Sequence, residues 1–188
     1  MTPNPTIDRA AAVRRALRTL VARHGLHGAS MSAIAKEAGV AQGTAYAHYQ
    51  SKEQLLVAAY LELKREMGTA ACADMDRAAT PHDRFIQVWL GVYHFLAEEP
   101  ERAQFMLQIE SSPYARVAHE MGMAVPDDPM MAEAAALYAA AVLAPLDLDV
   151  LYDLAYWPAI RRAARGDGID ETAARAIAEA CWRAITTG

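Results

Sequence analysis

Residues 30–56 read SMSAIAKEAGVAQGTAYAHYQSKEQLL, and this stretch sets the expected fold of the N-terminal part of the chain. Ser30 is placed to cap a short helix, and Gly39 is placed to end it, because glycine adopts a left-handed turn at low cost. A second short helix is expected from about Gln42 to His48. Two short helices that meet at a Gly-Val-Ala turn, with small residues where they would cross, predict a helix-turn-helix.

Gly43 is an unfavourable residue inside the second of these helices, where glycine costs roughly 1 kcal/mol relative to alanine. Ala45 and Tyr49 are four residues apart and are expected to point into the head, so the opposite side faces outward. A glycine on that side would let the backbone approach a base edge, and Gln42 can pair with adenine through two hydrogen bonds. Among the candidates, the serines, His48 and Lys52 are expected to contact phosphates. The full set of candidate DNA-contacting residues is Ser30, Ser32, Gln42, Gly43, Thr44, Tyr46, His48 and Lys52.

The segments on both sides of this stretch also have helical patterns. Val13, Leu17 and Val21 follow helical spacing and predict a helix from about residue 8 that stops between residues 25 and 28. Ser51-Lys52-Glu53-Gln54 has the form of a capping box and opens a long helix to about residue 73. Three helices and the start of a fourth therefore make up the expected head.

Helices are expected in nearly all of the remaining chain, because alanine is frequent and runs of β-branched residues are rare. Thr80-Pro81 begins a helix whose segment 84–99 is apolar on nearly every side, which is typical of the middle of a bundle. Further helices are predicted at 101–111, 130–143, 148–165 with a bend at Pro158, and 170–186. The segment 113–129 is predicted to be mostly loop, with a helical turn near residues 117–121 as an option. The expected inward face of the last helix is Ala173, Ile177, Ala180, Cys181 and Ala184.

The stretch 31–56 resembles the DNA-binding head of the tetracycline-repressor (TetR) family. The matching features are Ile34-Ala35, Ala38-Gly39-Val40, Gly43-Thr44, the aromatic residues Tyr46 and Tyr49, and Ser51-Lys52-Glu53 before leucine. The resemblance implies an all-α protein with a helix-turn-helix domain over residues 1–53 and a helical ligand-binding and dimerisation domain over 54–188. It also implies a homodimer on a double-stranded DNA operator, built through the last two helices, and a repressor released by a small apolar effector.

Charge is divided between the two parts of the chain. Residues 1–66 hold nine Lys/Arg against five Asp/Glu, and residues 67–188 hold nine against eighteen, within an overall net charge of −5. A basic head on an acidic body favours a polyanionic partner for the head alone.

Aromatic and methionine side chains in the body suggest an apolar pocket for a drug-sized organic molecule, although ordinary core packing explains the same residues. His94 is the best polar candidate for the interior. The candidate pocket residues are Trp89, Tyr93, His94, Phe105, Met106, Ile109, Met121, Tyr138, Tyr156 and Trp157.

Several classes of protein are disfavoured by the sequence. It has no phosphate-binding loop, nucleophile elbow or dinucleotide-binding turn, and its histidines lack the spacing of metal ligands, so we expect no enzyme, no metal and no cofactor. No segment resembles a signal peptide or a membrane span, and the two distant cysteines fit a reducing compartment, which together favour a cytoplasmic protein without membrane contact. The alternative is a helical small-molecule or partner-binding protein without DNA-binding activity.

Overall fold

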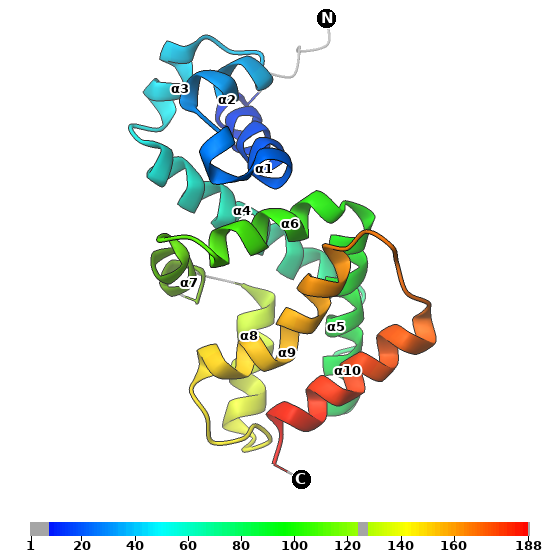
Figure 1. Ribbon diagram of the computed structural model, residues 1–188. Coiled ribbons are helices and arrows are strands. Elements are labelled where there is room, and N and C mark those ends of the chain that lie inside the picture. Colours follow the sequence, from blue (N-terminus) through cyan, green and yellow to red (C-terminus); the bar gives the residue numbers. More distant parts are fainter. Residues whose placement is uncertain (1–7, 124–127, 188) are drawn as a thin grey trace, which may run out of the picture.

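The computed structural model describes residues 8–123 and 128–187, and these residues form ten α-helices (Figure 1). An all-α fold is therefore confirmed. The helices are α1 (Arg9–Gly28), α2 (Met31–Glu37), α3 (Gln42–His48), α4 (Lys52–Cys72), α5 (Pro81–Glu98), α6 (Pro100–Glu110), α7 (Ala115–Met123), α8 (Pro129–Ala139), α9 (Leu148–Ala163) and α10 (Glu171–Ile185). None of them, within the described ranges, is both long and apolar enough to cross a membrane.

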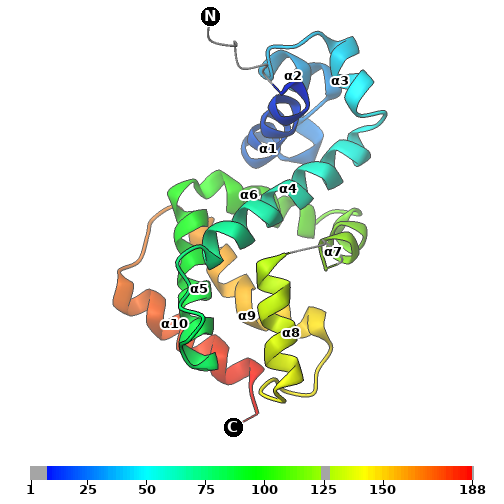
Figure 2. The ribbon, with the colours of Figure 1, turned by 180° about the vertical axis from the view of Figure 1, so that it is seen from behind.

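The molecule has a small head of α1, α2 and α3 and a larger body, and α4 runs from one into the other (Figures 1 and 2). The predicted domain boundary at residues 53 and 54 falls in the first turn of α4, which continues without interruption. The head also contacts the body directly, because α1 packs on α6.

Helix α5 is the centre of the body, as its sequence predicts. It packs against α4, α9, α10 and α6, and it buries side chains on most of its surface, including Phe85, Trp89 and Leu96. The Thr80 side chain caps its first turn by accepting a hydrogen bond from the Asp83 N–H at 3.1 Å. At the crossing with α4 the two backbones approach closely, because a Cβ added to Gly91 would lie 2.7 Å from the Cα of Ala71.

Two predicted features of the helices in the second half of the chain differ from the structure. In the segment 113–129, the helical turn considered near residues 117–121 is the longer helix α7, which occupies nine residues and buries Ala118. Residues 124–127 of this segment lie outside the described part of the chain. Helix α8 ends at Ala139 rather than residue 143, because Ala141 takes a left-handed conformation (φ 55°) and the chain then pairs with the C-terminus. That pairing is a single β-bridge between Leu143 and Thr186.

The buried face of α10 also differs from the prediction. The residues that α10 buries are Ala174, Ala178, Cys181 and Ile185. Ala180 and Ala184, which were expected to point inward, are exposed. Alanines occupy both faces of this helix, so the sequence gives little contrast between them, and packing against α5 and α9 selects the face.

Helix α9 continues through Pro158 as one element. Proline has no N–H, so the carbonyl of Leu154 loses its partner within the helix. Leu154 is exposed, and water can satisfy that carbonyl. The turn after α9 has the predicted glycines, and both Gly166 and Gly168 have positive φ.

Candidate nucleic-acid interface

The turn between α2 and α3 is fixed by the backbone of Gly39. Gly39 has a φ of 66°, and its N–H donates to the Lys36 carbonyl at 3.1 Å. The N–H of Val40 reaches back to the Ala35 carbonyl at 3.0 Å. This pair of hydrogen bonds is the Schellman motif, which ends a helix and turns the chain sharply. The predicted helix-turn-helix is therefore present, with α3 over the predicted residues.

The inner side of α3 packs against α1 and α2. Ala45 and Tyr49 are buried, as expected from their spacing. The Tyr49 hydroxyl accepts a hydrogen bond from the Arg14 guanidinium, which also pairs with Glu62 of α4 at 2.6 Å. These contacts fix the rotation of α3 about its own axis, and thereby decide which of its side chains face outward.

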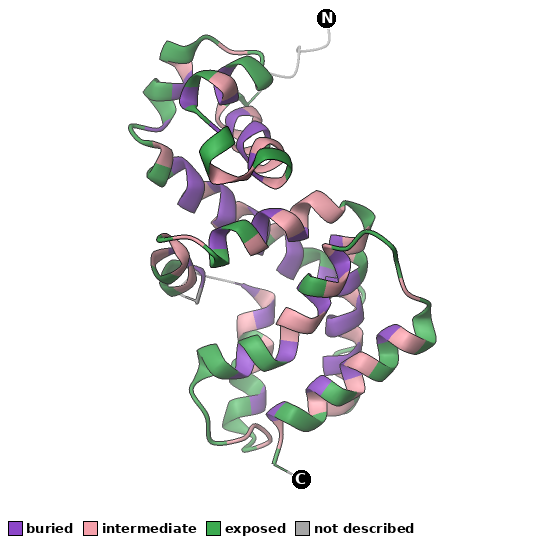
Figure 3. Cartoon of the chain, viewed as in Figure 1, coloured by how far each residue is buried: buried purple, intermediate pink, exposed green. Residues whose placement is uncertain are grey.

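Five of the predicted DNA-contacting residues lie on α3. Most of this helix is coloured as exposed in Figure 3. Gln42, Gly43, Tyr46 and His48 are exposed, Tyr46 to 45% of its surface, and Thr44 is half-buried. A Cβ added to Gly43 would meet no atom within 4 Å. The fold therefore does not require glycine at this position, and close approach of DNA to Gly43 remains a prediction.

The three remaining candidates have structural contacts of their own. Ser30 caps α2 by accepting a hydrogen bond from the Ala33 N–H at 3.2 Å, and its hydroxyl lies 3.0 Å from that of Ser32. Both serines are exposed. The Lys52 ammonium donates to the carbonyl of Leu26 near the end of α1, and partial burial lowers the pKa of Lys52. Lys52 thus joins α4 to α1, and a phosphate contact by this residue remains a prediction.

Several arginines of the head form ion pairs with glutamates of the same chain. Arg14 and Arg18 of α1 pair with Glu62 and Glu66 of α4, and Arg23 pairs with Glu101 of α6 at 2.7 Å. These arginines connect the head to the body. Part of the positive charge of the head therefore lies at this junction rather than on the outer side of α3.

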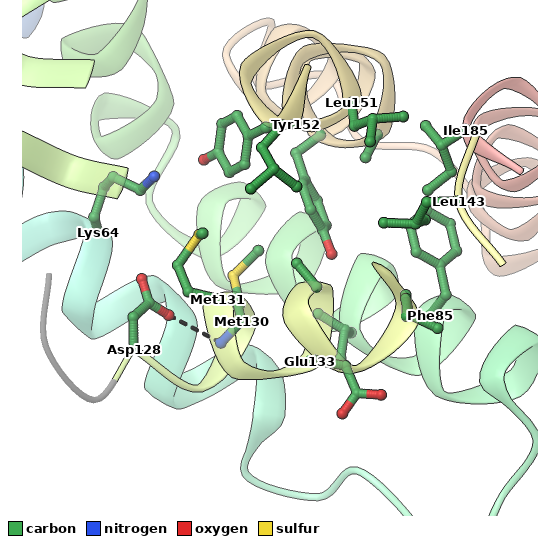
Figure 4. Close-up of a pocket in the computed structure, with 16 residues that line it drawn as sticks. Lys64, Phe85, Asp128, Met130, Met131, Glu133, Leu143, Leu151, Tyr152 and Ile185 are labelled. Atoms are coloured by element: carbon green, nitrogen blue, oxygen red, sulfur yellow. Dashed lines mark hydrogen bonds between the residues drawn. The ribbon is translucent and has the colours of Figure 1, made fainter. Parts of the chain in front are cut away.

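The body contains a second candidate site, an apolar cavity of about 50 Å³ (Figure 4). Its walls come from α4, α5, α8, α9, the segment after α8 and the end of α10. The lining residues are Lys64, Phe85, Val88, Asp128, Met130, Met131, Glu133, Ala134, Leu137, Leu143, Leu148, Leu151, Tyr152, Ala155, Tyr156 and Ile185.

Only Tyr156 of the ten predicted pocket residues lines this cavity. Five of the others are packed in the core away from it, namely Trp89, Tyr93, Phe105, Met106 and Ile109. Met121 and Tyr138 are exposed, and Trp157 is half-buried with its indole N–H donating to Asp153 at 2.7 Å. The expectation that His94 lies inside is wrong, because His94 is on the surface beside Glu171. A helix as apolar as α5 does not show in its sequence which residues meet a neighbour and which meet a cavity.

Four polar residues of the cavity, Lys64, Asp128, Glu133 and Tyr152, were missed by the sequence reasoning. Lys64 did carry a signal, since it is four residues after Tyr60 and four before Gly68 on the buried side of α4. A lysine on an otherwise apolar stripe is unusual. Among the described residues no group of three His, Cys, Asp or Glu side chains is placed to hold a metal ion.

A helix-turn-helix whose second helix is anchored on one side and exposed on the other is the architecture of a DNA-binding protein. Comparison with known proteins agrees with this class. Residues 13–59 match the family described as "Bacterial regulatory proteins, tetR family". An "Uncharacterized HTH-type transcriptional regulator" of Haemophilus influenzae Rd is 31% identical over 183 residues, which cover 95% of this chain and 96% of that protein.

Solved structures show the same fold over nearly the whole chain. A TetR-family transcriptional regulator from Haemophilus influenzae Rd superposes with a TM-score of 0.78 at 27% identity, covering 96% of this chain and 97% of that one. A crystal structure described as a putative tetR family transcription regulator from Shewanella sp. PV-4 gives 0.81 at 22% identity, covering 96% and 99%. The chain belongs to the TetR family and is a helix-turn-helix DNA-binding transcriptional regulator, in a family of regulators rather than enzymes.

Proposed function

We propose that this protein is a homodimeric repressor that reads a palindromic operator with α3 and leaves it when a small, largely apolar ligand binds the body. The observation that carries the proposal is the exposed side of α3, where Gln42, Gly43, Thr44 and Tyr46 extend from a helix whose rotation is fixed by Ala45 and Tyr49. Gln42 suits adenine, at about 1–3 kcal/mol of discrimination for a bidentate pair. Tyr46 suits a phosphate or a thymine methyl.

Exposed apolar side chains on α9 and α10 support dimerisation through these two helices. The large exposed hydrophobic residues include Leu148, Val150 and Leu154 on α9, and small residues such as Ala180 and Ala184 are exposed on α10. Exposed apolar surface of this kind marks a protein interface. Two copies joined there would present two heads, which must stand about 34–36 Å apart, or a related multiple, to read successive major grooves.

Release by a ligand is supported by the position of the cavity beside α4. Helix α4 lines the cavity through Lys64 and also holds α1 through Glu62 and Glu66. A ligand that binds better when the body is rearranged would shift α4, change the spacing of the heads and lower operator affinity, by differential binding to two states.

The test is fluorescence anisotropy with duplex DNA from the protein's own promoter region, against random duplex as competitor. Gln42→Ala and Tyr46→Ala should each abolish the preference for the promoter fragment while leaving the dimer intact. Affinity should fall steeply with salt, because phosphate contacts dominate binding. Arg116→Ala, an exposed change on α7, is the control and should bind as the wild type does.

A wild-type protein that prefers no promoter fragment over random duplex would contradict the proposal. If that protein still bound small molecules, the alternative of a ligand-binding protein without DNA-binding activity would be favoured.

A further inference from the structure

The cavity in the body has a polar end and an apolar end. Lys64 and Tyr152 lie together at one end, with Asp128 close to them, whereas Phe85, Leu143 and Ile185 lie at the other (Figure 4). A site with this polarity orients a ligand that has a polar head and an apolar tail.

Lys64 is the unusual member of this group because only 2% of its surface is exposed. Its ammonium lies 4.2 Å from the centre of the Tyr152 ring, which gives a cation–π contact. Removing an ammonium from water is costly unless an opposite charge or hydrogen-bond acceptors replace the water. None of the ion pairs found among the described residues includes Lys64.

The Tyr152 hydroxyl is a second buried polar group at the same end, and it has no hydrogen-bond partner among residues 8–123 and 128–187. Burial raises the pKa of Tyr152, so its hydroxyl remains protonated at neutral pH and can donate a hydrogen bond. Figure 4 shows this hydroxyl directed toward the Lys64 side of the cavity.

The two carboxylates that line the cavity already have partners. Asp128 caps α8 by accepting a hydrogen bond from the Met130 N–H at 2.9 Å. Glu133 pairs with the guanidinium of Arg84 at 2.5 Å. The polar end therefore offers donors from Lys64 and Tyr152 that an acceptor could meet, whereas the acidic groups are engaged with the protein.

A ligand of more than a few atoms needs the cavity to enlarge, because about 50 Å³ is far below the several hundred cubic ångströms of a typical ligand site. Helix α8 is the wall helix that buries the fewest residues, Met130 and Leu137 of its eleven. Its outward displacement exposes little apolar surface, although it separates Glu133 from Arg84.

We propose that the effector is an amphiphilic carboxylate, whose head binds Lys64 and Tyr152 and whose apolar chain extends toward Leu143 and Ile185. This inference rests on the proposed function, because it names the class of molecule that would release the operator. Binding would supply the buried ammonium with an opposite charge and the Tyr152 hydroxyl with an acceptor.

The test is isothermal titration calorimetry of the full-length protein with three probes of equal chain length, octanoate, octanamide and octylammonium, at pH 7. Octanoate should bind at least about tenfold more tightly than octanamide, since a hydrogen-bonded charge pair is worth this much or more. Lys64→Met should abolish the preference for octanoate over octanamide, and thermal unfolding of the variant reports that it is folded. Tyr152→Phe should weaken octanoate about tenfold.

A further variant tests the position of the tail. Leu143→Trp fills the apolar end and should weaken octanoate and octanamide alike. The inference is overturned if octanoate does not bind, if octanamide or octylammonium binds as tightly, or if Lys64→Met keeps the preference for octanoate. Promoter binding measured without any probe separates the two proposals, because a protein that binds its promoter specifically but not octanoate contradicts only the effector class.

Discussion

At Gly43 the backbone is helical, and a Cβ added to this residue would meet open space. At Gly39, three residues before α3, a Cβ would also meet open space, but the φ of 66° is one that side chains disfavour. The two glycines therefore differ in whether the fold requires them. Gly39 is required by the turn, whereas Gly43 is unnecessary for the folded chain and weakens α3.

Gly43→Ala is expected to stabilise the protein, or at least not to destabilise it, by up to about 1 kcal/mol, because alanine favours a helix. The same change should weaken promoter binding at least tenfold, because the added methyl group would hold the backbone of α3 away from the groove. Thermal unfolding measures the first effect and fluorescence anisotropy the second.

Gly39→Ala is the matched control, one alanine introduced in the same helix-turn-helix. It should destabilise the protein by about 1–2 kcal/mol, because alanine is strained in the left-handed region. A variant Gly43→Ala that is stabilised and binds the promoter as tightly as the wild type would show that close approach at this position plays no part.

Among the elements, α4 and α5 depend most on close backbone approach. The distance of 2.7 Å between an added Cβ at Gly91 and the Cα of Ala71 leaves no room for a methyl group, and the obstacle is backbone rather than a flexible side chain. This crossing sets the position of α4 in the body, and thus of the head that α4 supports.

Gly91→Ala should therefore destabilise the protein by about 1–3 kcal/mol, the usual cost of overpacking a core, even though alanine has the better helix propensity. Urea unfolding measures the change. Gly43→Ala, the same substitution in an exposed helix, is the comparison, and equal stabilities of the two variants would mean that α4 and α5 can separate without cost.

The elements also differ in how far the sequence predicts them. Polar caps and glycine turns locate α1 to α5 closely, because Asp8, Ser30, Ser51 and Thr80 each accept hydrogen bonds from the first turn of a helix. The buried face of α10 and the end of α8 were predicted wrongly, because alanine-rich segments have little contrast between faces and the β-bridge at Leu143 is a long-range contact.

In the whole molecule, α9 carries three exposed apolar side chains, Leu148, Val150 and Leu154. Leu154→Glu places a charge on this surface and should convert the proposed homodimer into a folded monomer, because an unpaired carboxylate is costly to bury. Light scattering coupled to gel filtration measures the mass. Promoter affinity should fall together with the dimer, since one head then reads one half-site.

Met121→Glu is the control for that experiment, because Met121 is similarly exposed but lies on α7. It should leave the mass unchanged. If Leu154→Glu remained a dimer, the interface would have to lie elsewhere than on this part of α9.

The sequence by itself determined the all-α fold, the helix-turn-helix and the outward-facing residues of α3, because these follow from local signals such as helical spacing, capping side chains and the glycine at residue 39. Only the tertiary structure decided which body residues line the cavity, that His94 lies outside, and that Lys64 and Tyr152 share one buried end. The physical reason is that several helices enclose the cavity, and the side that each helix turns inward depends on packing with the others rather than on its own residues.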